Sequence, residues 1–206
     1  YLPSALQGQP AVILRPGAPR ETTNAAATTD GLTSEGAAVL AADGSAEITL
    51  HQSFGGSLGM ALRTALGTMP DVQFQRIVEA KLLQQALPGA RLLKVEVRNQ
   101  ANLDAPITLV MSIRMRNFAR LQGNELHIAP PCLLHLSRLA VMKERETPLY
   151  ISDEVATHAE VRFQVKLPAG ASLATELPPS TLAAGRRTVV VRDRMKDGAF
   201  WFDRLV

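Results

Sequence analysis

Aromatic residues are scarce in this chain, at 4% of its 206 residues. The hydrophobic fraction is still 46%, which is ordinary for a globular protein, so a buried core must be built mainly from Leu, Val, Ile, Ala and Met. Lys and Arg number 22 against 19 acidic residues, and no run of basic residues marks a surface that follows a phosphate backbone. Because few aromatics are available for base stacking, we expect no nucleic-acid partner.

Cysteine is nearly absent as well. A single one, Cys132, excludes an internal disulfide and a four-cysteine metal site. No apolar run approaches the length of a membrane span, so we expect no transmembrane segment here. The chain starts at Tyr1 without an initiator Met or the pattern of a signal peptide. We therefore expect a piece of a longer protein, with any targeting signal outside it.

Turn signals divide much of the chain into short apolar stretches. Asp43-Gly44-Ser45 separates residues 37–42 from 46–54, and glycine tolerates the positive φ that tight hairpins require. Lys196-Asp197-Gly198 separates residues 188–191 from 200–202 in the same way. Both patterns predict β-hairpins.

Residues 92–98 are predicted to form a strand that ends at Asn99, and alternating side chains predict further strands over 107–115 and, most clearly, 159–167. Gly123-Asn124 marks a turn into a short strand at 126–128. Residues 133–142 fit either a strand or a helix. Many short strands separated by turns favour antiparallel sheets packed as a sandwich.

Two helices interrupt this pattern. Leu58, Leu62 and Leu66 are spaced by four, with Ser57 as the expected N-cap and Gly67 as the expected C-cap. A second helix is predicted from Pro70 and Asp71 to the stop signal at 87–89. Its apolar ladder, also spaced by four, consists of Phe74, Val78, Leu82 and Ala86.

The fold class predicted from these patterns is mainly β (α+β), an antiparallel β-sandwich with an inserted pair of helices near residues 57–88. Residues 1–15, including a short strand at 11–14, form a tail. Residues 16–36 are poor in large apolar side chains and are expected to be a linker or an edge strand. Residues 37–206 form the sandwich domain, which we expect to be truncated at its C-terminus.

Three residues close in sequence could carry chemistry. His127, Cys132 and His135 could bind a metal, but a zinc site needs a fourth ligand or water and supporting contacts. Cys132 could be a nucleophile with His135 as its base. A half-buried histidine and a core cysteine explain the same residues. We assign no catalytic residue, no metal ligand and no cofactor.

Other polar groups have equally ordinary explanations. Gly55-Gly56-Ser57 could hold an anion ahead of a helix, but the Gly-Lys-Ser/Thr of a P-loop is missing. A polar cluster before a predicted strand fits a solvated loop, and a strip of arginines fits the wet face of a sheet. The cluster is Asp153, Glu154 and His158; the strip is Arg114, Arg116, Arg120 and Arg138.

Several short stretches together resemble a known family. They are Tyr1-Leu2-Pro3, Leu6-Gln7-Gly8, Ala11-Val12-Ile13-Leu14, Asp43-Gly44-Ser45-Ala46, the corner from Gly55 to Arg63, Leu87-Pro88-Gly89 leading into Val95-Glu96-Val97, and Leu167-Pro168-Ala169-Gly170. This series is similar to the tail and β-rich domain that follow the catalytic core of bacterial transglutaminase-like proteins. The resemblance implies that the Cys, His and Asp of the papain-like core lie before Tyr1, and that the setting is the bacterial cell envelope or periplasm. Cys132 does not sit in the family's catalytic context.

Three functions remain open from the sequence. The first is a non-catalytic accessory domain beside the upstream transglutaminase-like core of the same chain, with a protein or glycan partner. The second is a stand-alone carbohydrate- or protein-binding sandwich. In that case at most part of the trio Phe200, Trp201 and Phe202 faces one ligand, because alternate strand residues point to opposite faces, and a Trp201 that covers core is the simpler explanation. The third is an enzyme that uses Cys132 and His135, or a metal held with His127.

Overall fold

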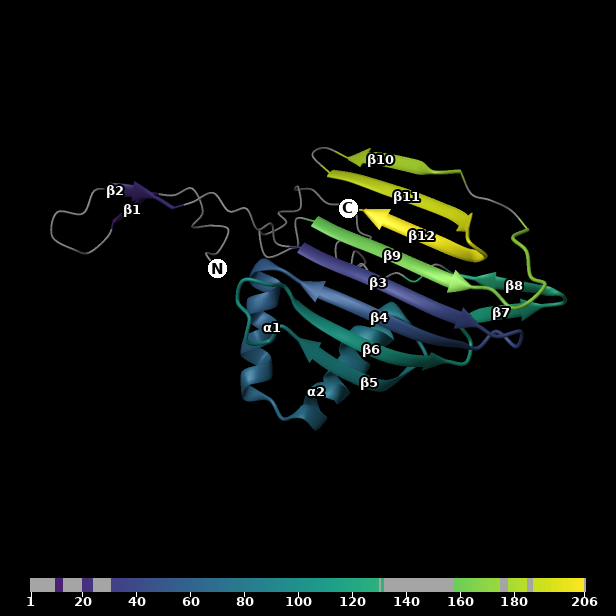
Figure 1. Cartoon of the computed structure of the whole chain (residues 1–206), viewed down its shortest axis with the longest axis horizontal. Coiled ribbons are helices and arrows are strands. Elements are labelled where there is room, and N and C mark those ends of the chain that lie inside the picture. The colour runs from purple at the N-terminus through teal and green to yellow at the C-terminus, as the bar shows by residue number, and fades with distance from the viewer. Residues whose placement is uncertain are drawn as a thin grey trace, which may run out of the picture.

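The computed structural model describes residues 10–12, 20–23, 31–129, 131, 158–174, 178–184 and 187–205. Strands dominate this part of the chain, and four consecutive helical segments form one insertion between them (Figure 1). The elements are β1 (Pro10–Val12), β2 (Arg20–Thr22), β3 (Gly31–Leu40), β4 (Ala46–Phe54), α1 (Gly56–Thr68), α2 (Asp71–Ile77), η2 (Val78–Leu83), α3 (Gln84–Ala86), β5 (Ala90–Arg98), β6 (Ile107–Met115), β7 (Ala119–Gln122), β8 (Glu125–Ile128), β9 (His158–Lys166), β10 (Ser180–Ala184), β11 (Arg187–Lys196) and β12 (Ala199–Leu205).

One eight-stranded sheet organises the fold. Its strand order is β10-β11-β12-β9-β3-β4-β6-β5, so each half of the sheet comes from one continuous part of the chain. The two halves meet where β3 pairs with β9, in parallel, whereas the other ladders of this sheet are antiparallel. Two small sheets, β1-β2 and β7-β8, accompany it.

The mainly β class with inserted helices is confirmed. The layers are not two large sheets, because the described strands form one large sheet and two small ones. One face of the large sheet is covered partly by the helices, which contact β4, β5 and β6, and partly by the β7-β8 hairpin. The helices are needed because β4 and β5 run parallel on either side of β6, and parallel strands require a crossover connection.

Both predicted hairpins are present. Gly44, at φ +85°, turns β3 into β4, and the turn at residues 197–198 joins β11 to β12. The alternating stretches became β5, β6 and β9 within two residues of the predicted bounds. The linker prediction was wrong for residues 31–36, because β3 begins at Gly31 and is an interior strand. Strand β10 was not predicted.

Both predicted caps of the first helix were wrong. Gly55 is the N-cap of α1, which places Ser57 inside the first turn. Gly67 also lies within the helix, and Met69, in an extended conformation, is the C-cap. The backbone turns at Gly56, which adopts φ +54°, and this early turn starts the helix before the serine.

The second helix departs from regular spacing in its middle. From Val78 to Leu83 the helix is of the π type, in which backbone hydrogen bonds join residues five apart and each turn is wider than in an α-helix. The buried face therefore passes from Val78 to Leu83, whereas Leu82 is only partly buried. The ladder spaced by four correctly identified Phe74, Val78 and Ala86, but it missed this shift.

The core lies between the sheet and the layer that covers it. Its central side chains are fully buried: Leu50, Val78, Leu83, Leu109, Met111, Ile113, Val161, Phe163 and Val165. The β7-β8 region contributes Phe118, whose ring stacks on Phe163 with centroids 6.1 Å apart. One hydrogen bond, from the Ala119 amide to the Gly44 carbonyl (2.9 Å), ties this hairpin to the β3-β4 turn.

Candidate binding face

The second face of the large sheet is polar. Side chains alternate along each strand, so the residues between the core positions point away from the helices. The register aligns them in rows across neighbouring strands. On β11, β12 and β9 one row is Lys196, Ala199 and Lys166, the next is Arg194, Trp201 and Gln164, and the third is Arg192, Asp203 and Arg162. We call these nine residues the Trp201 face.

Trp201 occupies the middle of this face. Its strand neighbours Phe200 and Phe202 point into the core, where they are buried and their rings meet edge to face at 4.5 Å. Trp201 itself is only partly buried, and its indole nitrogen donates a hydrogen bond to the Lys196 carbonyl at 3.4 Å. The explanation that Trp201 covers core therefore does not hold for this side of the strand. The Trp201 ring therefore supplies aromatic surface on the outer face of the sheet.

Positive charge gathers around the indole. The Trp201 face carries five cations against one carboxylate, Asp203, and Glu160 lies one row further along β9. Two of the cations are paired. Arg194 contacts Asp203 at 2.9 Å, and Arg162 contacts Glu160 at 2.6 Å.

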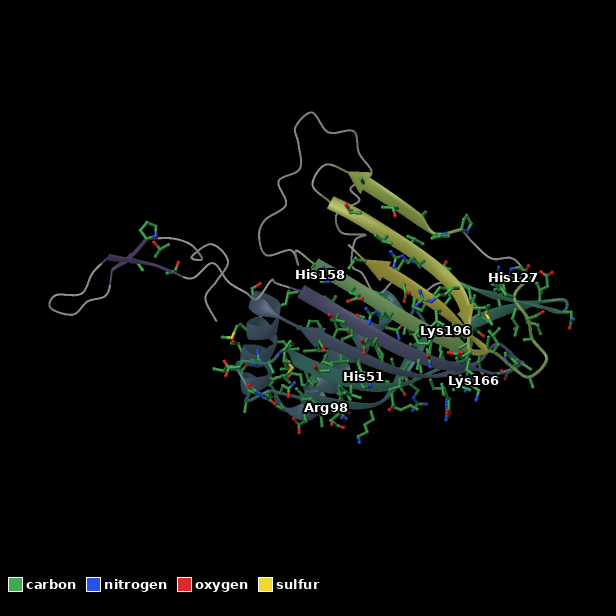
Figure 2. The ribbon with its side chains drawn as sticks, turned by 45° about the horizontal axis from the view of Figure 1, so that its top comes forward. His51, Arg98, His127, His158, Lys166 and Lys196 are labelled. Carbon is green, nitrogen blue, oxygen red and sulfur yellow. The ribbon has the colours of Figure 1, made fainter. Side chains whose placement is uncertain are left out.

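Three cations of the Trp201 face have no acceptor among the residues that the structure describes. They are Lys166, Lys196 and Arg192. The two lysines flank the small Ala199, so their Cα atoms lie roughly 9–10 Å apart, two strand spacings. Figure 2 shows both lysines at the same end of the strands.

A buried ion pair behind this face fixes the β11-β12 hairpin. Asp193 and Arg204 form a bidentate contact on the core side, with Arg204 Nη2 3.1 Å from Asp193 Oδ2. The Asp193 side chain is 2% exposed, and the Arg204 guanidinium lies 5.8 Å from the Phe202 ring. Because bidentate geometry orients both side chains, this pair links β11 to β12, two of the three strands that carry the Trp201 face.

On the core side of the sheet, next to the β7-β8 hairpin, lies a mostly apolar cavity of about 720 Å³. The sheet supplies Leu40, Phe200 and Phe202, and the hairpin supplies Leu126 and Ile128. Residues 167–174 close one side of it. Asp193 reaches the wall, but its carboxylate is already engaged by Arg204.

Of the three residues singled out from the sequence for metal or nucleophile chemistry, the structure describes His127. His127 lies on β8, about half exposed and 3.2 Å from Glu125, whereas Cys132 and His135 lie outside the described residues. The metal and nucleophile hypotheses therefore stay predictions. Asp153, Glu154, Arg138 and the stretch 133–142 also lie outside the described residues.

The other polar candidates are separated. His158 begins β9 at the end of the strand opposite Lys166 (Figure 2). Arg120 is on β7, across from His127, whereas Arg114 and Arg116 are at the end of β6. The glycines 55–56 form the corner between β4 and α1, where the Gly59 amide donates to the Gly55 carbonyl at 3.2 Å. The arginine strip expected from the sequence is thus split between two places.

Part of the Trp201 face follows from a local signal in the sequence. A two-residue turn at Asp197-Gly198 pairs Lys196 with Ala199, and this register places Arg194 beside Trp201. The wet side of β9, Gln164 and Lys166 included, was recognised from its alternation. What the sequence did not show is that β9 is the next strand along from β12.

Comparisons with known proteins add no assignment. No family model matches the chain, and searches of curated proteins and of solved structures also find no match. Among the described residues, no helix is long and apolar enough to cross a membrane.

Proposed function

We propose that this chain is a non-catalytic binding module that holds an acidic glycan on its Trp201 face. The observation that carries the proposal is the outward-facing indole of Trp201 surrounded by three unpaired cations. Sugar rings stack on aromatic faces, and carboxylate groups pair with Lys and Arg. The amide of Gln164, directly beside the indole, adds both a donor and an acceptor for hydroxyl groups.

Other anionic partners fit this face less well. Single-stranded nucleic acids bind by stacking successive bases on several aromatics, and Trp201 is the one aromatic that the described strands present outward. A sheet face with one outward aromatic and cations on either side of it suits a glycan chain that makes one stacking contact and carries charges along its length. An acidic peptide would use the cations but would leave the indole face without a role.

The expected setting forms part of the same proposal. We infer from the sequence resemblance that the module follows a transglutaminase-like core in a longer bacterial envelope protein, where it would bring the core to a glycan surface. Only the short motifs quoted above support this setting. If the upstream core is expressed with and without the chain, its stability and its activity on glycan-attached substrate should both fall without it. Unchanged values would count against this placement.

The binding proposal is tested by titration calorimetry with two probes: an oligosaccharide that carries a carboxylate on its sugar units, and its carboxyl-reduced counterpart. We expect saturable binding of the acidic probe that weakens with added salt, and little binding of the neutral one. Trp201→Ala and the double variant Lys166→Gln/Lys196→Gln should each weaken binding at least tenfold.

Lys94→Gln is the matched control. Lys94 lies on the same outer row as Trp201, at the far edge of the sheet on β5, and it is exposed. Its substitution removes one positive charge from the same face without touching the indole or its neighbours. The proposal fails if the acidic probe does not bind, if Trp201→Ala binds it as well as the parent chain, or if Lys94→Gln causes an equal loss.

A further inference from the structure

A hollow of about 400 Å³ opens at the start of the edge strand β5, at the opposite edge of the sheet from β11 and β12. Three of its lining residues are arginines from separate positions: Arg91 at the start of β5, Arg114 at the end of β6, and Arg116 just beyond it. The remaining lining comes from Pro88, Gly89, Leu93, Met115 and Asn117. We call this hollow the arginine pocket.

Two of these arginines lie opposite each other, where their positive charges repel. Arg91 and Arg114 are direct partners in the β5-β6 ladder, and like charges directly opposite each other destabilise a sheet. Glu47, on the neighbouring strand β4, lies 3.0 Å from Arg114 on the side away from Arg91. Neither Arg91 nor Arg116 has an acceptor in the part of the chain that the structure describes.

The backbone around the arginine pocket is fixed in shape. A β-bulge between Leu92 and Lys94 adds Leu93 to the strand and turns its side chain into the lining. On the other side, the Gln84 side chain accepts from the Gly89 amide (3.0 Å) and donates to the Ala90 carbonyl (2.7 Å). Arg91, the second residue of β5, therefore comes directly after a turn whose backbone is held by the Gln84 side chain.

We infer that the arginine pocket binds a compact dianion of the phosphate type. A single carboxylate, Glu47, cannot balance three guanidinium groups, whereas a dianion between Arg91 and Arg114 would remove their repulsion. Guanidinium groups bind tetrahedral oxyanions through paired, parallel N–H donors, and three such groups can engage several oxygens at once. This inference is independent of the glycan proposal, because it uses other residues at the other edge of the sheet.

Inorganic phosphate is the first probe, compared with chloride at equal ionic strength, and its binding is followed by calorimetry and by the midpoint of thermal unfolding. We expect saturable binding of phosphate and a rise in the midpoint that chloride does not produce. Glycerol phosphate and acetate are run alongside. Binding of glycerol phosphate as well would identify phosphate esters as ligands, and binding of acetate with equal affinity would overturn the phosphate assignment.

The variant Arg91→Gln/Arg116→Gln should bind phosphate at least tenfold more weakly. Without phosphate it should unfold at the same midpoint as the parent chain or slightly higher, since a like-charge pair has been removed, so loss of fold cannot mimic the expected result. The control is Arg98→Gln, on the same face and strand but paired with Glu96 at 2.8 Å and away from the pocket (Figure 2). Equal phosphate responses in the parent chain and the double variant would refute the site, as would an equal loss in Arg98→Gln.

Discussion

Replacing Gly36 by alanine tests how tightly β3 and β9 pack against each other at Phe163. Gly36 on β3 lies directly opposite Phe163 on β9, and a Cβ placed there would be 2.1 Å from ring carbon Cδ2 and 2.2 Å from Cε2. Neither side can yield easily. The Phe163 side chain is 0% exposed and stacks on Phe118, and the backbone of β3 is paired with strands on both sides.

Overpacking of a tight core costs about 1–3 kcal/mol, and this contact belongs at the upper end of that range or above it. We therefore expect Gly36→Ala to lower the free energy of unfolding by about 3 kcal/mol. For a chain of this size, the midpoint of thermal unfolding should fall by roughly 6–12 °C. The free energy is measured by urea unfolding followed by far-ultraviolet circular dichroism, with the dependence on urea compared between variants.

A double-mutant cycle identifies the cause. Phe163→Val removes the ring and should itself cost about 3 kcal/mol, but in that background Gly36→Ala should cost less than about 1 kcal/mol. Gly67→Ala is the control, because nothing lies within 4 Å of the added Cβ and alanine favours the helix, so stability should rise by about 0.5–1 kcal/mol. Additive costs at positions 36 and 163 would refute the steric reasoning.

Three further predictions concern polar contacts. Asp193→Ala leaves Arg204 without its buried partner and should lower the free energy of unfolding in urea by about 3–5 kcal/mol, and Arg204→Leu in the same chain should restore part of it. Arg63 donates to four carbonyls between Asn99 and Ala105 (2.6–3.2 Å), so Arg63→Gln should speed hydrogen exchange of residues 99–106 while exchange in β6 stays slow. Hydrogen bonds from the Ser45 hydroxyl and then its amide lower the pKa of Asp43 below 3.8, so a nuclear magnetic resonance titration of Ser45→Ala should find that pKa closer to 3.8. The stabilisation from these bonds is complete above pH 3.8 and is lost as the pH falls through the lowered pKa.

Most strands could be predicted because local rules determine them. Alternation of period two defined β6 without error at either end, since one of its faces is buried from Ile107 to Ile113 and the other is not. The turn at Gly44 was visible because its positive φ favours glycine. The start of β3 could not be predicted from the sequence, because residues 31–36 place Ser34 and Gly36 on the core side, where a large apolar side chain is expected. Ser34 is buried and accepts a hydrogen bond from the Gln52 side chain (3.2 Å), and the ring of Phe163 occupies the space beside Gly36.

The two proposed sites were less accessible from the sequence, because each joins residues through non-local pairing. Arg91 and Arg114 are 23 positions apart, and only the β5-β6 register brings them together. Trp201 and Arg194 follow from a local hairpin, but Gln164 and Lys166 join them through the β9-β12 ladder. The π-helical segment Val78–Leu83 could not be predicted for a different reason. The residues around it show ordinary helical spacing, and it is packing that selects Leu83 over Leu82.

The parallel pairing of β3 with β9 means that the sheet consists of two groups of strands, within residues 31–115 and 158–205, that share one ladder. The β3-β9 ladder joins residues farther apart in sequence than the other ladders of this sheet do, so its formation should be the slow step in refolding. The same arrangement lends itself to fragment complementation. Two polypeptides separated between positions 129 and 158 should recombine in solution through this ladder and the packing of Phe118 on Phe163, and two intact copies should be able to exchange halves in the same way.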